Sequence, residues 1–187
     1  MTIGKAGCRC MAFPTPLGEM ALAWENRGSG RTKIVRILLP RKNPLRQMRE
    51  FLPGAVEGTD QSVSAFARRI ARYLSGEDIV LPIDLLDLEG LNDFQRQVLL
   101  AEYEIPRGKT TSYARLAARS GFPGAARAAG TALATNPFPI VIPCHRSVRA
   151  DGALGGYGGG LPMKRTLLEM EGVEFDARGR VKSSFMI

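Results

Sequence analysis

Cys144 and His145 are neighbours, and their side chains are the ones best suited to do chemistry together. His145 is the only histidine, and Cys144 is the only cysteine outside the first ten residues. A thiol has an unperturbed pKa of about 8.5 and reacts as the thiolate, so an imidazole and nearby cations favour a nucleophile. Adjacent side chains on an extended segment point in opposite directions, which leaves room for a bridging water. A buried cysteine beside a hydrogen-bonded histidine is the alternative.

The segments around this pair predict how it is held. The apolar run 140–142 is predicted to be a short buried strand that ends at Pro143. Downstream, residues 155–160 are glycines except for Tyr157, so their N–H groups could approach a planar ligand or an anion, although a flexible linker would look the same. A helix is predicted over 163–170. Glu171 follows it and could orient His145, because a carboxylate on one ring nitrogen leaves the other for the thiol.

Three helices are predicted upstream of the pair. Asn92 and Gln95 suit a capping box at the start of the first helix, which Pro106 and Gly108 end. The second spans 112–119 and the third 124–135, and the short turn between them suggests a helix-turn-helix. The expected buried positions are Leu91, Phe94, Val98 and Ala101 on the first helix, Leu116 and Ala117 on the second, and Ala126, Ala129, Gly130 and Leu133 on the third.

The third helix carries almost only small side chains. Arg127 and Thr131 fall on its outer flank, and Arg127 is its only long polar side chain. A major-groove reader would carry several long polar side chains, so this helix favours the minor groove of DNA with little sequence readout. An alanine-rich helix packed against another domain is the alternative.

Positive charge gathers in the same region. The chain has 26 Lys and Arg against 18 Asp and Glu, a net charge of +8, and a pI near 9.9. No carboxylate occurs from 105 to 150, a segment that holds seven basic residues. A polyanionic partner is therefore expected, with a solvated basic face as the alternative.

The N-terminal half predicts an α/β unit. Two alternating runs, 20–24 and 35–39, flank turn-forming residues 26–30 and predict a hairpin. A short helix is expected over 45–52, a stronger helix capped by Ser62 and ended by Gly76, and a strand over 79–85 with Pro82 at a sheet edge. A boundary is expected at 86–91. The predicted parts are an N-terminal domain 1–87, a C-terminal domain 88–173 and a tail 174–187.

Composition narrows the class of protein. The 187 residues are 44% hydrophobic, and no apolar run approaches the ~20 residues that span a membrane. The start of the chain has no apolar targeting segment, so a cytoplasmic, prokaryotic-like protein is expected. Cys8 and Cys10 are interpreted as reduced thiols near a flexible terminus, because His145 is too far along the chain to complete a metal site with them.

Several motifs together resemble one family. FQRQVL, IPRGKTTSY, ARAAG, NPFPIVIPCHR, GGYGGG and LLEMEG occur between about residues 94 and 172. In this order and spacing they resemble the O6-alkylguanine-DNA alkyltransferases, also called methylated-DNA–protein-cysteine methyltransferases. The resemblance implies a ribonuclease-H-like α/β domain followed by a mainly α domain with a winged helix-turn-helix. It implies a monomer that binds the minor groove of double-stranded DNA containing O6-alkylguanine and needs no cofactor or metal.

The resemblance also assigns roles. Cys144 would accept the alkyl group once and irreversibly, His145 would activate it through water, and Glu171 would complete the relay. Arg127 would fill the space left by a flipped nucleotide. Tyr113 would help to rotate the phosphate and donate to the leaving guanine, and Asn136 would brace the junction of helix and site. The remaining assignments are Thr110, Ser112, Ala126 and Ala128 for DNA contact, and Tyr157, Gly158, Gly159, Pro139, Ser147 and Lys164 for the pocket.

Two other functions compete with repair. An alkyltransferase-like protein would recognise the lesion without transfer, but such proteins lack the acceptor cysteine that Cys144 provides. A cysteine hydrolase would turn over acyl substrates, which explains neither the helix with Arg127 nor the carboxylate-free segment. The sequence departs from the family's usual pattern at Leu99, Arg107, Ala134, Thr135 and Ser147.

Overall fold

The computed structural model describes residues 7–28 and 31–187 and divides the chain into two compact units. The first six residues, where a targeting segment was sought, and residues 29–30 of the predicted turn lie outside the described residues. Unit 1 is formed by residues 1–90 with Pro137–Val141, and unit 2 by Leu91–Asn136 with Ile142–Ile187. The chain therefore returns to unit 1 just before it reaches Cys144.

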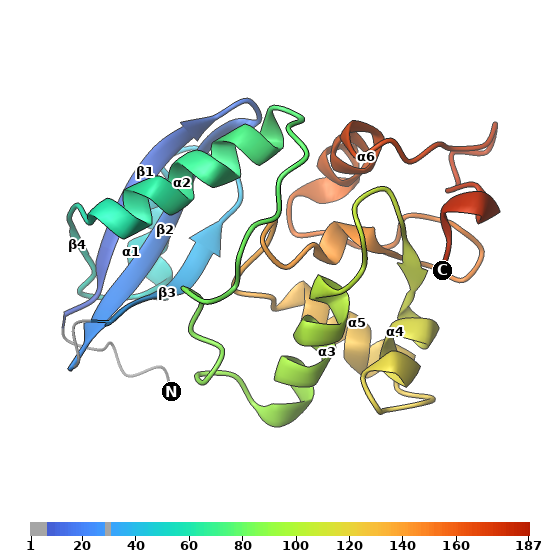
Figure 1. The fold of residues 1–187 in the computed structure, drawn as a ribbon, viewed down its shortest axis with the longest axis horizontal. Helices are drawn as coiled ribbons and strands as arrows, with labels where there is room; N and C mark the ends of the chain where they lie inside the picture. The colour runs from blue at the N-terminus through green and yellow to red at the C-terminus, as the bar shows by residue number, and fades with distance from the viewer. Residues whose placement is uncertain (1–6, 29–30) are drawn as a thin grey trace. The chain divides into compact units, whose positions relative to one another are not determined.

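Unit 1 is built on a mixed four-stranded sheet in the order β3-β2-β1-β4 (Figure 1). β2 (Gly18–Arg27) pairs antiparallel with both β1 (Arg9–Thr15) and β3 (Arg31–Leu38), and the short β4 (Val56–Glu57) runs parallel to β1. The predicted hairpin is confirmed as β2 and β3. β1 was not predicted, because its residues RCMAFPT show little alternation and include a proline.

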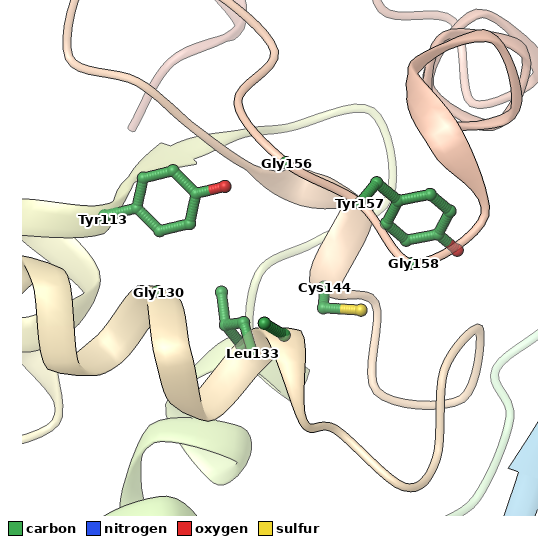
Figure 2. A pocket seen from close by; sticks show the side chains of 8 residues that line it. Tyr113, Gly130, Leu133, Cys144, Gly156, Tyr157 and Gly158 are labelled. Carbon is green, nitrogen blue, oxygen red and sulfur yellow. The ribbon is translucent and has the colours of Figure 1, made fainter.

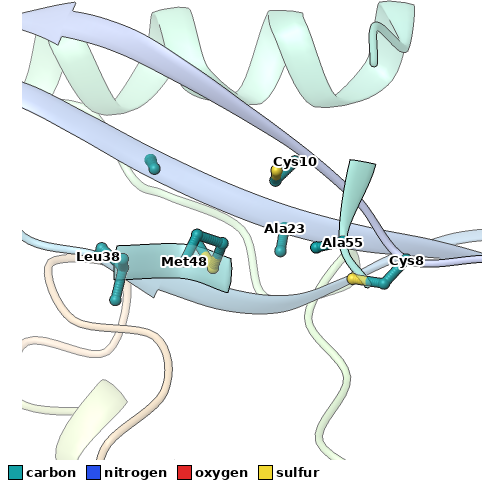
Figure 3. Packing of buried hydrophobic residues seen from close by; sticks show 7 residues of the cluster. Cys8, Cys10, Ala23, Leu38, Met48 and Ala55 are labelled. Atoms are coloured by element: carbon teal, nitrogen blue, oxygen red, sulfur yellow. The ribbon is translucent and has the colours of Figure 1, made fainter. Parts of the chain in front are cut away.

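Helices cover both faces of this sheet. α2 (Gln61–Leu74) lies across one face in Figure 1, and α1 (Pro44–Phe51) supplies Met48 to an apolar cluster on the other face. Figure 3 shows that cluster, in which Cys8 and Cys10 pack with Ala23 and Leu38. Cys8 and Cys10 are free thiols, as expected, but they are packed in this cluster, with exposed fractions of 3% and 0%.

Two expectations for unit 1 were wrong. Asp60, rather than Ser62, caps α2, and its carboxylate accepts from the N–H groups of Ser62 and Val63. The predicted strand 79–85 is irregular chain, which meets β3 where the Ile34 N–H donates to the carbonyl of Leu85 and Lys33 Nζ donates to the carbonyl of Asp84. The alternating side chains of this segment resemble a strand. Pro82 has no N–H to donate to a neighbouring strand, and the segment forms its backbone hydrogen bonds with β3 after that proline.

Unit 2 is mainly helical. Its elements in order are α3 (Asp93–Tyr103), β5 (Thr111–Ser112), α4 (Tyr113–Arg119), α5 (Ala126–Ala134), the 3-10 turn η1 (Cys144–Arg146), β6 (Ser147–Val148), α6 (Gly160–Met170) and the 3-10 turn η2 (Ser183–Phe185). β5 and β6 form a two-stranded parallel sheet, which brings the start of α4 beside the chain that leaves Cys144. The predicted helix pair of the helix-turn-helix is present as α4 and α5.

The ends and faces of these helices differ from the prediction in detail. Asn92 caps α3 by accepting from the Gln95 N–H, and the Gln95 side-chain amide donates to the carbonyl of Thr135 at 3.3 Å. Leu91 and Phe94 are only half-buried, whereas Leu99 and Glu102 are fully buried. Likewise, α5 begins two residues later than predicted, Ala126 is half-buried on it, and α6 begins three residues earlier.

The segment that leads to Cys144 is buried but is not a strand. Ile140 has a φ of 74°, a left-handed conformation that β-branched residues rarely adopt, so the chain turns where a strand was expected. After α6, the predicted tail 174–187 packs within unit 2 through Phe175, Val181, Phe185 and Met186. Among the described residues, no helix is long and apolar enough to cross a membrane.

Candidate functional site

Cys144 and His145 lie on the 3-10 turn η1 rather than on an extended segment. Pro143 precedes the turn, and the N–H of Arg146 donates to its carbonyl at 2.8 Å. The side chains of neighbouring residues on such a turn diverge by about a third of a turn, not by half. Cys144 is 8% exposed and His145 is completely buried.

His145 is held by the carboxylate of Glu171, as the sequence predicted. His145 Nε2 lies 2.7 Å from Glu171 Oε1, and both side chains are fully buried. A carboxylate partner places the ring proton on Nε2, which leaves Nδ1 as the acceptor of a neutral imidazole. Nδ1 is buried and has no hydrogen-bond partner among the described residues. It is therefore the ring atom that could take a proton from the thiol.

Arg146 is a member of this network that the sequence reasoning missed. Its guanidinium donates from Nε to Glu171 Oε2 at 2.8 Å and from Nη2 to Oε1 at 3.0 Å, a bidentate pair. Its Nη1 also donates to the carbonyl of Ile105, the first residue after α3 and its end turn. The only signal in the sequence was adjacency to His145, and nothing there shows an arginine turned inward.

The charges of the network follow from burial and from these contacts. Burial acts to raise the pKa of Glu171, but His145 and the Arg146 guanidinium outweigh it, so that pKa lies well below its usual range. Burial lowers the pKa of His145 more than Glu171 raises it. At neutral pH the site therefore holds a carboxylate, a guanidinium and a neutral imidazole.

The thiol of Cys144 is neutral at rest. Burial raises its pKa to about 11, although a hydrogen bond with Asn136 and the charge of Lys164 act in the opposite direction. A base must therefore take the proton when the sulfur reacts. Asn136 is fixed for its contact with the thiol because its amide also donates to the carbonyl of Ile142 at 3.0 Å.

Cys144 opens into a pocket of about 440 Å³ within unit 2 (Figure 2). Tyr113 at the start of α4 and Leu133 of α5 lie on one side of it, and Cys144 and Tyr157 on the other. Of the predicted site residues, Tyr113, Cys144, Tyr157 and Gly158 line the pocket. The prediction missed four further lining residues, which are Gly130, Leu133, Ala134 and Gly156.

Gly155, in the glycine-rich loop 155–160, lies close to the Tyr113 side chain. Gly155 has a φ of +67°, and a Cβ added to it would lie 2.8 Å from the hydroxyl oxygen of Tyr113. Only glycine allows this approach without moving the ring. The loop and Tyr113 are therefore in mutual contact, which a flexible linker would not require.

The other predicted residues fall into three groups. Arg127 and Ala128 are exposed on α5, in keeping with a surface that meets a partner. Thr110 and Ser112 are buried and already bonded, since Thr110 donates to the carbonyl of Phe185 and Ser112 caps α4. The predicted pocket residues Pro139, Ser147, Gly159 and Lys164 are absent from the lining.

No metal site accompanies these side chains. Within residues 7–28 and 31–187, no three or more His, Cys, Asp and Glu side chains come together to hold an ion. The thiol of Cys144 lines the pocket and can act as a nucleophile with the neighbouring imidazole of His145 as base.

Comparison with known proteins agrees with this chemistry. Residues 93–173 match the family described as 6-O-methylguanine DNA methyltransferase, DNA binding domain. A methylated-DNA–protein-cysteine methyltransferase of Mycobacterium tuberculosis is 41% identical over 157 residues, 84% of this chain and 88% of the relative. The chain belongs to the methylated-DNA–protein-cysteine methyltransferase family. As the family's name states, the reaction moves a methyl group from methylated DNA to a cysteine of the protein.

Other relatives of this methyltransferase widen the comparison. The enzyme of Methanothermobacter thermautotrophicus is 47% identical over 109 residues, which are 58% of this chain and 61% of that protein. The crystal structure of M. tuberculosis OGT in complex with DNA has a TM-score of 0.69 at 34% identity, over 87% of this chain and 92% of that one. The O6-methylguanine-DNA methyltransferase of Pyrococcus kodakaraensis has a TM-score of 0.61 at 26% identity, over 89% and 99%. The methyltransferase therefore shares its mixed sheet and helices with solved family members.

Proposed function

We propose that this methyltransferase repairs duplex DNA by taking the alkyl group from the O6 atom of a flipped guanine onto Cys144. The observation that carries the proposal is the position of Cys144. The 3-10 turn of Cys144 also carries His145 and Arg146, which both bind the Glu171 carboxylate. The Cys144 side chain lines a pocket together with Tyr113 and residues of α5. Cys8 and Cys10, in contrast, are packed in the sheet of unit 1.

The proposed reaction is a single displacement at the alkyl carbon. His145 Nδ1 takes the thiol proton, directly or through a solvent water, and Glu171 stabilises the imidazolium that forms. The sulfur forms a bond to the alkyl carbon while the bond from that carbon to O6 breaks, and the electron pair goes to the guanine. The guanine anion then takes a proton, for which we assign the Tyr113 hydroxyl in the pocket wall as the donor, and the tyrosinate regains a proton from solvent water.

The product is a thioether, and no described group is placed to hydrolyse it. Each molecule therefore acts once, as a reagent rather than a turning-over catalyst. The same reasoning separates transfer from lesion recognition without transfer, for which a buried, base-assisted cysteine in the pocket would have no use.

The binding mode is also proposed from the surface of α5. This helix presents Arg127, Ala128 and Thr131 to solvent, so it can approach the minor groove closely with one long side chain. We assign α4 and α5 to a winged helix-turn-helix and unit 1 to a ribonuclease-H-like domain. A monomer suffices, since unit 2 alone supplies the residues named in the reaction.

Intact mass tests the proposal directly. The protein is incubated with a duplex containing one O6-methylguanine, and we expect its mass to rise by one methylene, with peptide mapping placing the methyl group on Cys144. The amount of modified protein should never exceed one equivalent. An unmodified protein that still binds the duplex would show lesion recognition alone, and product in molar excess over protein would show a hydrolase.

Arg127→Ala should slow transfer from duplex DNA by about 10- to 100-fold, because nothing would then fill the base stack after the guanine leaves. That range corresponds to the few kcal/mol that base extrusion costs. Transfer from a free O6-alkylguanine base needs no extrusion and should stay within twofold of the unaltered protein. Arg165→Ala, which removes an equal charge from α6, is the matched control. Equal losses on both substrates would contradict the role given to Arg127.

A further inference from the structure

A second buried polar cluster lies beside the pocket, and the reaction proposed above does not use it. Glu102 of α3, Ser147 of β6 and Lys164 of α6 are each completely buried. Ser147 Oγ donates to Glu102 Oε2 at 2.6 Å, and Lys164 Nζ donates to the carbonyl of Ser147 at 2.6 Å. Glu102 and Lys164 thus both hydrogen-bond to Ser147, which lies three positions after Cys144.

Lys164 connects this cluster to two residues of the pocket wall. Its Nζ also donates to the carbonyl of Gly156 at 3.4 Å and lies 5.9 Å from the centroid of the Tyr113 ring. Gly156 and Tyr113 both line the pocket. An ammonium group has three protons to donate and is attracted to the face of an aromatic ring, whereas a neutral amine loses that attraction. The charge of Lys164 therefore matters for the position of both wall residues.

Burial works against that charge. It lowers the pKa of Lys164 to about 8, and the two groups that oppose this effect are Cys144 and Glu102. Since the resting thiol is neutral, Glu102 is the anion that supports Lys164 before transfer. Burial also raises the pKa of Glu102 to about 7, against the hydrogen bond from Ser147 and the charges of Lys164 and Arg146. Glu102 Oε1 is buried and has no hydrogen-bond partner among the described residues. The carboxylate is therefore stabilised at that oxygen by nearby positive charge rather than by a hydrogen bond.

The geometry points to Glu102 as a positioning residue for alkyl transfer, whose carboxylate keeps Lys164 an ammonium and thereby holds Gly156 and Tyr113 in the pocket wall. This inference rests on the proposed function. Glu102 acts through Lys164 and need not touch the guanine. Loss of the carboxylate should therefore change how the reaction depends on pH, which loss of packing alone would not do.

The first test is a titration of the lysine side chains by NMR. The chain has six lysines, and the Cε signal missing from Lys164→Arg identifies Lys164. We expect its midpoint near the pKa of about 8 in the unaltered protein and about one pH unit lower in Glu102→Gln. Glu104→Gln removes an exposed carboxylate two residues along the chain and should leave the midpoint unchanged.

The second test is the pH profile of single-turnover transfer from a free O6-alkylguanine base. A fall of one unit in the Lys164 midpoint makes Glu102→Gln about fivefold slower than the unaltered protein at pH 8, with a smaller difference at pH 6. Glu102→Asp should recover part of the loss. If Glu102→Gln does not fold, Glu102→Leu has a similar volume without a polar group and serves in its place.

The outcomes separate the inference from the function on which it rests. No transfer by the unaltered protein at any pH would overturn the proposed function. Normal transfer together with an unmoved Lys164 midpoint in Glu102→Gln, or with a loss of rate that is equal at every pH, would overturn the role of Glu102 alone.

Discussion

Replacing Cys144 by serine should abolish alkyl transfer completely while leaving binding to O6-methylguanine DNA within about threefold. A serine hydroxyl is a far weaker nucleophile than a thiol at neutral pH, and His145 is arranged to assist only one proton transfer. Serine has the same shape as cysteine and is slightly smaller, so it fits the site without displacing the pocket walls. Transfer is measured by intact mass, and binding by fluorescence anisotropy on the same duplex.

Cys10→Ala is the matched control for loss of a cysteine. Cys10 is completely buried in the sheet of unit 1, so its removal should cost some stability but leave the mass increase at one equivalent. Modification of the Cys144→Ser protein, or lack of modification in the Cys10→Ala protein, would show that the acceptor had been wrongly assigned.

Glu171→Gln should slow transfer by about 10²- to 10⁴-fold, the range associated with a base that has lost its orienting carboxylate. An amide can still accept from His145 Nε2, but it cannot stabilise the imidazolium that forms when the thiol loses its proton. The change also leaves the Arg146 guanidinium, which is 9% exposed, without the carboxylate of its bidentate pair. Breaking a buried pair in this way costs about 3–5 kcal/mol of folding free energy.

The same substitution should change the response to acid. The pKa of Glu171 is lower in the folded protein than in the unfolded chain. Its contribution to stability is therefore present above the ordinary glutamate pKa of about 4.3 and is lost as pH falls through the folded-state value. Denaturant titrations between pH 7 and pH 3 should show a steeper decline for the unaltered protein than for Glu171→Gln.

Glu169→Gln is the control on the same helix. Glu169 pairs with Arg165 at the surface, where such pairs contribute at most about 0.5 kcal/mol. Both transfer and acid response should match the unaltered protein. Glu171→Gln protein that is folded and transfers within threefold of the normal rate would remove Glu171 from the relay.

The sequence predicted the contact between His145 and Glu171 better than it predicted the elements that carry the site. A single histidine beside an isolated cysteine limits the alternatives, and Glu171 follows a helix whose periodicity is clear. The 3-10 turn under Cys144 could not be predicted, because the left-handed Ile140 that precedes it depends on burial in the folded protein rather than on local preference.

Residues that act through buried charge were the hardest to find. Arg146 and Glu102 are of types that normally face solvent, and a periodic pattern treats both as surface positions. Their burial depends on partners far along the chain, Glu171 and Ser147, and no spacing rule links those residues. For the same reason β1 was not predicted, because its extended conformation depends on pairing with β2 rather than on its own residue pattern.

The return of Pro137–Val141 to unit 1 affects how the protein can be divided. A fragment that began at residue 91 would carry this stretch without the sheet whose Ile37 N–H donates to the Pro137 carbonyl at 2.8 Å. Phe138 and Val141, which are 1% and 2% exposed, would lose their packing only a few residues from the reactive sulfur. Such a fragment would keep Cys144, His145 and Glu171. It would lose the contacts that fix Pro137–Val141, the segment leading into the 3-10 turn of Cys144.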